Sequence, residues 1–350
     1  VRNRVFDTKF ALPVASHNLV LGGQASQRRL IDQNPGRRDG TAARFTIREH
    51  ALFVEDEWRL ADAFALTGGA RLDHHRIYGD HWSPRLYGVW HAGARLTVKG
   101  GVSRGFRAPE IRQIAPGYAY TTGGANCSYG PTGTCAVIVG DPGLKPETST
   151  STELAVLWDN HQGFDAHLTL FHTDFRDKVT DVQPLDANGD YLRWSEDPNY
   201  RVYYWSNVDR ARIKGAELGS RWAPREDLNL IASWTRTLSR QMSGAYKGYA
   251  LARTPDQLAQ LRAEWAPAAG WKLWLGGNWH GREINAQLRT GSAGKPIPTP
   301  NGRVVREYGG YASADLGGSW QLGRQTTLNA AVYNRSEERR VGKECRLLCR

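Results

Sequence analysis

The chain has 350 residues, and 46 Lys and Arg against 35 Asp and Glu give it a formal charge of +11 at neutral pH. A mean hydropathy of −0.56 and the lack of any run near ~18 apolar residues exclude a helical membrane protein. They do not exclude a transmembrane β-barrel, whose strands direct only every second side chain to lipid.

The composition and the first residues set further expectations. Thirteen Trp, 14 Tyr and 38 Gly suit a membrane barrel. Met242 is the only methionine, and the chain opens at Val1 within a strand pattern and without a leader, so we expect a cut end of a longer protein. The basic excess is compatible with nucleic acid, anionic lipid headgroups or an anionic ligand, or with a surface that simply faces lipopolysaccharide and solvent.

Apolar residues at every second position predict a chain built almost entirely of β-strands. The segment LNLIASWT at residues 228–235 places Leu, Leu, Ala and Trp on one face and mainly polar side chains on the other. About fourteen strands are expected, at residues 3–12, 17–31, 44–60, 64–78, 82–91, 94–106, 151–159, 164–177, 203–222, 228–241, 254–266, 271–287, 308–322 and 326–334. Tryptophans that resemble the girdles at membrane interfaces bound several apolar faces, at Trp58, Trp158, Trp222, Trp271 and Trp320. Core aromatics of a soluble β-protein are the alternative.

The connections between these strands alternate in length. Longer links, above all residues 107–150 and 178–202, lie between short turns at residues 13–16, 61–63, 92–93, 160–163, 223–227, 267–270 and 323–325. Short periplasmic turns alternating with long extracellular loops are typical of outer-membrane barrels, whereas a propeller or sandwich has no reason to keep that parity. The pattern predicts an all-β fold, a transmembrane antiparallel β-barrel whose backbone groups are paired within the sheet.

Two proline-containing motifs frame the longest loop. SRGFRAPE occupies residues 103–110, and DPGLKPETST occupies residues 141–150. Pro109 cannot donate a ladder hydrogen bond and holds the preceding residue extended, so strand pairing should end near Ala108. The prolines of the second motif similarly delay the return strand until its last four residues.

These motifs resemble the paired S-x-x-F-R/K-A-P and N/D-P-x-L-K-P-E-T-S segments of TonB-dependent receptors. HWSPRLYGVWH, YWSNVDRARIKGAELG and LNAAVYN, at residues 81–91, 204–219 and 328–334, extend the resemblance. It implies a barrel of 22 strands, of which the fourteen here would be the eighth to the twenty-first. Residues 1–334 would be the C-terminal part of that barrel, with the plug domain absent. The resemblance also implies a multi-pass protein of the bacterial outer membrane, in which the TonB–ExbB–ExbD complex acts through the plug to power import.

Cys127 and Cys135 lie in the loop between the motifs, with seven residues between them. In an exposed, oxidising setting they are expected to form a disulfide that closes a small ring and limits the unfolded freedom of the loop. Free thiols or part of a metal site are the alternatives, although no clustered His supplies further zinc ligands and the other two cysteines lie in residues 335–350. A cysteine pair just before the KPET segment resembles the enterobactin and colicin I receptor-like branch, which takes up ferric catecholate siderophores.

A receptor for a bulky, aromatic and anionic ferric catecholate should present Arg beside Tyr and Trp on its outer loops. Guanidinium groups neutralise the catechol oxygens and stack on rings. The candidate ligand contacts are Arg37, Arg38, Arg107, Arg112, Tyr118, Tyr120, Arg193, Trp194, Tyr200 and Arg201. A solvated loop side chain is the alternative for each. Iron would travel as the siderophore complex, so no resident cofactor is expected; outer-membrane lipid, lipopolysaccharide and a colicin or phage are the other expected partners.

Several other patterns are expected to carry no site. Strand alternation sends His74 and His75 to opposite faces, so they should not share a metal ion. No G-x-S-x-G, H-E-x-x-H or phosphate-binding loop occurs, and we expect neither an enzyme nor a nucleic-acid-binding protein. RSEERRVGKECRLLCR at residues 335–350 breaks the strand pattern and is expected to be a non-native tail.

Three other functions remain open on the sequence alone. A passive, porin-like channel would have no plug domain. Another TonB-dependent receptor would carry cobalamin, haem or a carbohydrate. A soluble β-rich adhesin or enzyme with a basic face would partition into the aqueous phase without detergent.

Overall fold

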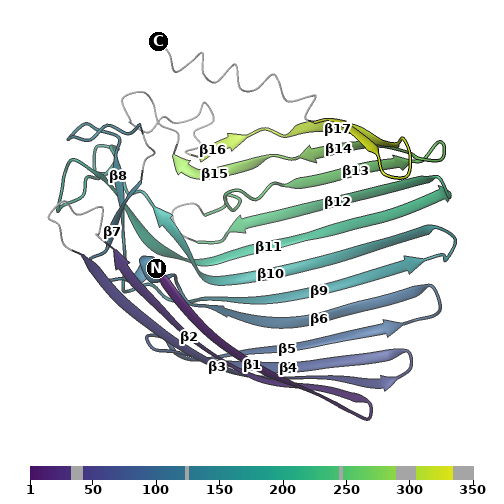
Figure 1. The fold of residues 1–350 in the computed structure, drawn as a ribbon. Coiled ribbons are helices and arrows are strands. Elements are labelled where there is room, and N and C mark those ends of the chain that lie inside the picture. The colour runs from purple at the N-terminus through teal and green to yellow at the C-terminus, as the bar shows by residue number, and fades with distance from the viewer. Residues whose placement is uncertain (33–41, 123–125, 244–246, 289–304, 334–350) are drawn as a thin grey trace.

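The computed structural model describes residues 1–32, 42–122, 126–243, 247–288 and 305–333. Fourteen antiparallel strands follow one another in chain order across one large sheet (Figure 1). They are β1 (Arg2–Val14), β2 (His17–Asp32), β3 (Ala43–Ala61), β4 (Phe64–His75), β5 (Gly79–His91), β6 (Leu96–Arg107), β9 (Glu147–Asp159), β10 (Phe164–Val182), β11 (Arg201–Arg225), β12 (Leu228–Gln241), β13 (Gln257–Trp265), β14 (Trp271–His280), β17 (Tyr311–Gln321) and β18 (Thr327–Val332). The prediction of an all-β, antiparallel fold is confirmed.

Four short strands and one helical turn lie in the longer connections. α1 (Ile111–Ile114), β7 (Ala119–Thr122) and β8 (Ala136–Val139) separate β6 from β9, and β8 pairs in parallel with the start of β11. β15 (Glu283–Leu288) and β16 (Val305–Tyr308) form a separate two-stranded sheet. Within the described ranges, no helix is long and apolar enough to cross a membrane.

The prediction of one strand over residues 271–287 is wrong, because the structure divides this segment. β14 ends at His280, and β15 pairs with β16 instead of continuing along the neighbours of β14. At the break, the N–H of Gly281 donates to the Gln257 carbonyl at 2.7 Å. A Cβ at Gly281 would lie 2.8 Å from the Gln257 nitrogen, so this approach to β13 has no room for a larger residue.

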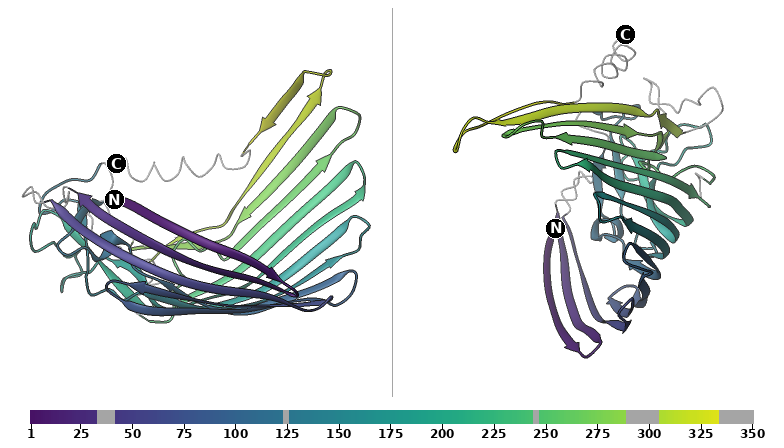
Figure 2. Two further views of the ribbon diagram at one scale, coloured as in Figure 1. Left: turned by 60° about the horizontal axis from the view of Figure 1, so that its bottom comes forward. Right: turned by 90° about the vertical axis from the view of Figure 1, so that its right-hand side faces the viewer.

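The sheet has one apolar face and one polar face. On the apolar face, one row of exposed side chains contains Leu168, Leu218, Trp234 and Trp279. On the polar face, Arg71 Nε lies 2.9 Å from Asp73 Oδ1. Exposing apolar area to water costs roughly 25 cal/mol per Å², so the apolar face suits contact with lipid. We call it the outer face and the polar face the inner face; Figure 2 shows that the sheet curves like a trough.

Short turns and longer connections alternate along the sheet, as predicted, except that only residues 76–78 join β4 to β5. Two-residue turns join β1 to β2, β3 to β4 and β11 to β12, whereas residues 108–146 and 183–200 separate β6 from β9 and β10 from β11. The two-residue turns lie at one edge, and the long connections lie at the other together with the β4–β5 turn (Figure 1). At the short-turn edge, Trp271 stacks on Trp320 with ring centroids 4.9 Å apart. This placement matches an interfacial aromatic girdle.

Candidate ligand site at the loop edge

Prolines fix the longest connection at both of its roots. β6 ends at Arg107, just before the Ala-Pro pair, and β9 begins at Glu147, directly after Pro146, as the two motifs predict. The backbone N–H of Glu110 donates to Gln113 Oε1 at 2.6 Å, which is half of a capping box for α1. The chain therefore enters a helical turn as soon as strand pairing ends.

α1 packs on the inner face of strands that are not its sequence neighbours. Ile111 and Ile114 are buried in one cluster with Leu30 of β2 and Ile47 of β3. Leu144, from the far end of the same loop, belongs to this cluster. Full burial of each large aliphatic side chain stabilises the packing by about 1.5–3 kcal/mol. The loop thus reaches back past β4 and β5 and rests on β2 and β3.

Asp32, the last residue of β2, connects this strand to the loop. Its Oδ2 accepts a hydrogen bond from the Tyr118 hydroxyl at 2.9 Å and lies 3.5 Å from Arg112 Nη2. Burial, followed by the bond to Asp32, raises the pKa of Tyr118 to about 12. Tyr120 stacks on Tyr118, with ring centroids 5.8 Å apart. Arg112, with 47 % of its side chain exposed, is the charged group of this set at the surface.

A second cluster joins the two longest connections to each other. Val137 of β8 pairs with Val202 of β11, and both side chains are fully buried against Trp194. Because the three residues come from different segments, neither connection can move without the other. We call the described parts of residues 108–146 and 183–200 the loop unit.

A disulfide and an arginine stabilise the loop segments beside the second cluster. Cys127 and Cys135 are joined by the disulfide expected from the sequence, with Cα atoms 4.7 Å apart. Arg193 donates from Nη1 to the Gly130 carbonyl at 3.3 Å and from Nη2 to the Gly133 carbonyl at 3.0 Å. Burial lowers the pKa of Arg193. The guanidinium therefore fixes the small disulfide ring to residues 183–200.

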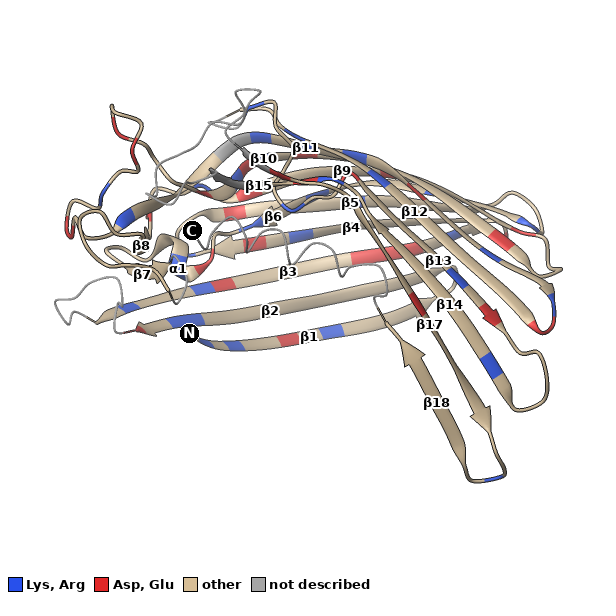
Figure 3. Cartoon of the chain, turned by 90° about the horizontal axis from the view of Figure 1, so that it is seen from above, with Lys and Arg blue, Asp and Glu red and all other residues tan. Residues whose placement is uncertain are grey.

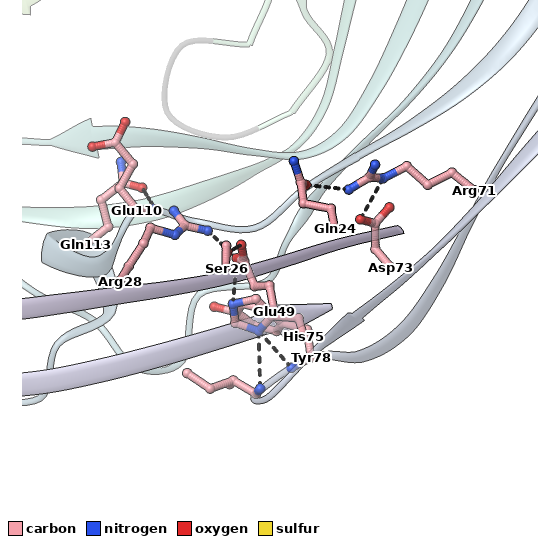
Figure 4. A network of polar contacts seen from close by, with 11 residues as sticks. Gln24, Ser26, Arg28, Glu49, Arg71, Asp73, His75, Tyr78, Glu110 and Gln113 are labelled. Carbon is pink, nitrogen blue, oxygen red and sulfur yellow. Dashed lines mark hydrogen bonds and ion pairs between the residues drawn. The ribbon is translucent and has the colours of Figure 1, made fainter. Parts of the chain in front are cut away.

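A polar network lies beside α1 on the inner face (Figure 4). Glu49 is paired with Arg28 and accepts a hydrogen bond from Ser26 Oγ at 3.0 Å. His75, whose side chain is 1 % exposed, places Nε2 3.3 Å from Glu49 Oε1. Two backbone N–H groups of the β4–β5 turn donate to His75 Nδ1 at 3.2 and 3.4 Å, so the ring carries its proton on Nε2. The network fixes the loop-edge ends of β2, β3 and β4 to one another.

A cavity of about 290 Å³ lies between this network and the start of the loop, and Arg28, Glu49, Arg107 and Glu110 are among its lining residues. The Arg107 side chain is 67 % exposed, and its nitrogens lie 3.5 Å from Glu110 Oε1 and 3.6 Å from Glu147 Oε2. Exposed ion pairs contribute about 0–1 kcal/mol. The guanidinium can therefore exchange these contacts for those of an incoming anion.

His74 and His75 face opposite ways, as strand alternation predicts. His74 is exposed, with Nδ1 2.6 Å from Asp80 Oδ1, whereas His75 is buried beside Glu49. In the part of the chain that the structure describes, no three His, Cys, Asp or Glu side chains gather as they would around a metal ion.

The chain that forms this sheet, with one apolar and one polar face, matches a known family over almost its whole length. The pattern described as TonB dependent receptor-like, β-barrel, covers residues 2–334. This chain belongs to the TonB-dependent receptor family. The paired motifs around the longest loop are thus the ends of two barrel strands in a TonB-dependent receptor.

Known proteins that resemble this TonB-dependent receptor chain include some whose names refer to iron. It is 35 % identical over 336 residues to the iron-regulated outer membrane virulence protein of Vibrio cholerae, covering 95 % of this chain and 47 % of that protein. It is 31 % identical over 307 residues to the ferric enterobactin receptor of Pseudomonas aeruginosa, covering 84 % and 38 %. A crystal structure of a mutant of that receptor in complex with enterobactin has a TM-score of 0.74 at 26 % identity, covering 95 % and 49 %. The chain spans about half the length, or less, of the curated relatives it matches.

Four of the ten candidate ligand residues of this TonB-dependent receptor are buried in the structure, and ligand contact through them stays a prediction. These are Tyr118, Trp194, Tyr200 and Arg201, with exposed fractions of 0, 3, 6 and 7 %. The Arg201 guanidinium lies over the Tyr191 ring, 4.9 Å from its centroid. In this conformation these side chains hold the loop unit together. Arg37 and Arg38 lie outside the described residues, as does the segment 335–350.

The remaining candidates and two further residues form the accessible part of the site. Arg107 and Arg112 are exposed, Tyr120 is half-buried, and Arg193 is half-buried against backbone carbonyls. The sequence interpretation missed Asp32, which positions Arg112, and Glu147, which accepts the Val179 N–H at 2.6 Å beside Arg107. Glu147 is the acidic residue of the KPET segment, so the motif contained it, but only the fold brings it to Arg107.

Proposed function

We propose that this chain forms the ligand-binding wall of an outer-membrane receptor that imports a ferric siderophore, of the catecholate class. The observation that carries the proposal is the exposed pair Arg107 and Arg112. Arg107 ends β6, and Arg112 and Tyr120 belong to the loop unit, which is packed onto the barrel wall. The relatives named as ferric enterobactin receptors support the ligand class.

The chemistry of the accessible residues suits a ferric catecholate. Such a complex is anionic and presents flat aromatic rings, so a planar guanidinium can bind its oxygens and stack on its rings. The ion pairs of Arg107 and Arg112 with described residues are long, at 3.5–3.6 Å, and involve carboxylates that solvent reaches. Tyr120 adds an aromatic surface beside Arg112. The ligand would thus replace weak contacts with charge-assisted hydrogen bonds.

The proposal gives the iron the role of cargo and gives this chain no catalytic role. Transport would require a plug domain and the TonB–ExbB–ExbD complex, and family membership is the support for both. The polar inner face, with pairs such as Arg71 and Asp73, provides a surface on which such a plug could rest. A colicin or phage that uses the same loops, and residues 335–350 as a non-native tail, stay expectations from the sequence.

The deciding experiment is growth on defined iron sources. The gene that contains this chain is expressed in an iron-starved strain that lacks its own siderophore receptors, with and without the TonB protein. Growth on a ferric catecholate, but not on a ferric hydroxamate or haem, and only with TonB, is the expected result. Growth on every small iron complex without TonB would show a passive channel. Growth on haem, or enhanced cobalamin uptake in place of catecholate-dependent growth, would assign the receptor to another cargo.

A further inference from the structure

Six exposed arginines gather on the outer face at the loop edge of β1–β4. They are Arg2, Arg4, Arg29, Arg44, Arg48 and Arg76, which we call the arginine patch. In one row of the ladder Arg4 lies opposite Gln27, which lies opposite Arg48, and the Arg76 N–H donates to the Arg48 carbonyl at 3.2 Å. In the next row Arg2 lies opposite Arg29. Figure 3 shows basic segments at this end of β1, β2 and β3.

The same face becomes apolar directly below the patch. Side chains two positions apart in a strand share a face. Phe6 therefore follows Arg4 on the outer face of β1, and Leu52 lies on the outer face of β3 four residues after Arg48. Leu52 pairs with Leu72, which pairs with Trp82. Phe6, Leu52 and Trp82 are 69, 69 and 64 % exposed. The patch therefore lies at the level where the lipid-facing band ends.

Among the described residues, the arginines of the patch have no acidic partners, unlike several arginines on the inner face. Arg28, Arg71 and Arg85 on the inner face of β2, β4 and β5 are each paired with a carboxylate, those of Glu49, Asp73 and Glu55. None of the six patch residues forms an ion pair with a described residue. Farther along the outer face, Arg212 and Arg236 are also paired, with Asp174 and Asp256, so the lack of partners is local to the patch. Six neighbouring positive charges repel one another unless anions from the surroundings neutralise them.

We propose that the arginine patch binds the phosphate groups of lipid headgroups in the leaflet that surrounds the loop edge. A guanidinium matches a phosphate through two parallel hydrogen bonds, and basic clusters at the membrane surface bind anionic headgroups. The site rests on the membrane placement of the barrel. It is independent of siderophore binding, because Arg107 at the end of β6 and Arg112 of α1 belong to the site on the inner face, whereas the patch lies on the outer face.

The test compares two triple variants of the full receptor, purified in detergent. Arg29→Gln with Arg48→Gln and Arg76→Gln removes three charges from the patch. Arg59→Gln with Arg95→Gln and Arg324→Gln removes three exposed charges at the short-turn edge as the matched control. Diphosphorylated lipid A is titrated and its binding followed by native mass spectrometry. We expect the Kd to rise about tenfold or more in the patch variant and to stay within about twofold in the control.

Further arms separate lipid binding from other causes. Monophosphorylated lipid A should bind the unaltered receptor more weakly, and phosphatidylethanolamine should show no difference between the variants. Equal Kd values in all three proteins, or equal losses in both triple variants, would overturn the proposal. Full competition by inorganic phosphate would assign the patch to free anions and also overturn it. If the patch variant fails to fold, the three single variants replace it, and each should weaken binding less than the triple change. Unchanged ferric-catecholate affinity in the patch variant keeps this result separate from the transport proposal.

Discussion

Arg107 and Arg112 differ from the other candidate residues in how weakly they are held. Their guanidinium nitrogens lie no closer than 3.5 Å to a carboxylate oxygen of any described residue, and both side chains are about half exposed or more. Arg193 instead donates to two backbone carbonyls, and Arg201 is buried over an aromatic ring. At the scale of single residues, a charge that is accessible and weakly paired is the one that a ligand can recruit at small cost.

The first prediction concerns these two arginines. Arg107→Ala and Arg112→Ala should each raise the Kd for a ferric catecholate about 5- to 30-fold, the range for truncation of a useful contact residue. The double variant should lose more than either single one. The Kd is measured by quenching of intrinsic fluorescence in the purified receptor, with Arg324→Ala as an exposed control at the opposite edge. Unchanged affinity in both single variants and the double variant would remove this site from the proposal.

A second prediction concerns the Tyr118 hydroxyl, whose pKa is raised from 10.0 to about 12. A proton held more tightly in the folded state adds stability that is present below pH 10 and is lost as the pH rises toward 12. Tyr118→Phe keeps the ring but removes the bond to Asp32, so it should destabilise the loop unit by about 1–3 kcal/mol below pH 10. The tyrosinate absorbance of the unaltered receptor minus that of the variant should show one transition with its midpoint near pH 12. A midpoint near pH 10 would show that the hydroxyl is solvated.

At the scale of elements, the strands could be predicted and the contents of the loops could not. The alternation of apolar and polar residues along a strand is visible in consecutive residues, and prolines end strand pairing locally. The end of β6 and the start of β9 could therefore be predicted from the sequence. β8 pairs in parallel with β11, far along the chain, and has no period of its own. The burial of Trp194 depends on the packing of two loops against each other. Residue type alone therefore could not distinguish a ligand contact from a loop core.

The third prediction tests whether the disulfide stabilises the loop unit. A ring of this length stabilises by about 2–3 kcal/mol through the freedom it removes from the unfolded loop. Cys127→Ser with Cys135→Ser should therefore speed hydrogen exchange in residues 126–139 and leave β9 and β10 unchanged. The siderophore Kd should rise modestly, because a looser loop must be ordered on binding. Equal exchange in both proteins would show that Arg193 and the β8–β11 pairing suffice without the disulfide.

At the scale of the whole molecule, apolar and polar side chains alternate along the strands because the two faces of the sheet meet different environments. The outer face exposes Leu, Val and Trp in rows, and the inner face pairs its charges. A soluble β-sandwich would bury its apolar face against a second sheet, but the described buried clusters lie at the loop edge and involve the loop unit. This is why the barrel wall could be predicted from periodicity and parity, whereas the curvature of the sheet and the reach of the long loop to β2 and β3 could not.

The last prediction tests the assignment of the two faces with one substitution on each. Leu168 lies on the outer face of β10, four residues from its start at the short-turn edge and 41 % exposed, and its neighbour Thr169 lies on the inner face opposite Glu217. An arginine on the lipid face near the bilayer centre costs about 2–4 kcal/mol, whereas an arginine at position 169 would gain a carboxylate across the ladder. In urea unfolding of the receptor folded into phospholipid vesicles, Leu168→Arg should therefore lower the free energy of unfolding by about 2–4 kcal/mol, and Thr169→Arg should change it little. Equal losses of unfolding free energy in both variants, or a larger loss in Thr169→Arg, would mean that the apolar face does not contact lipid. The assignment of the outer and inner faces, or the placement in a membrane, would then be wrong.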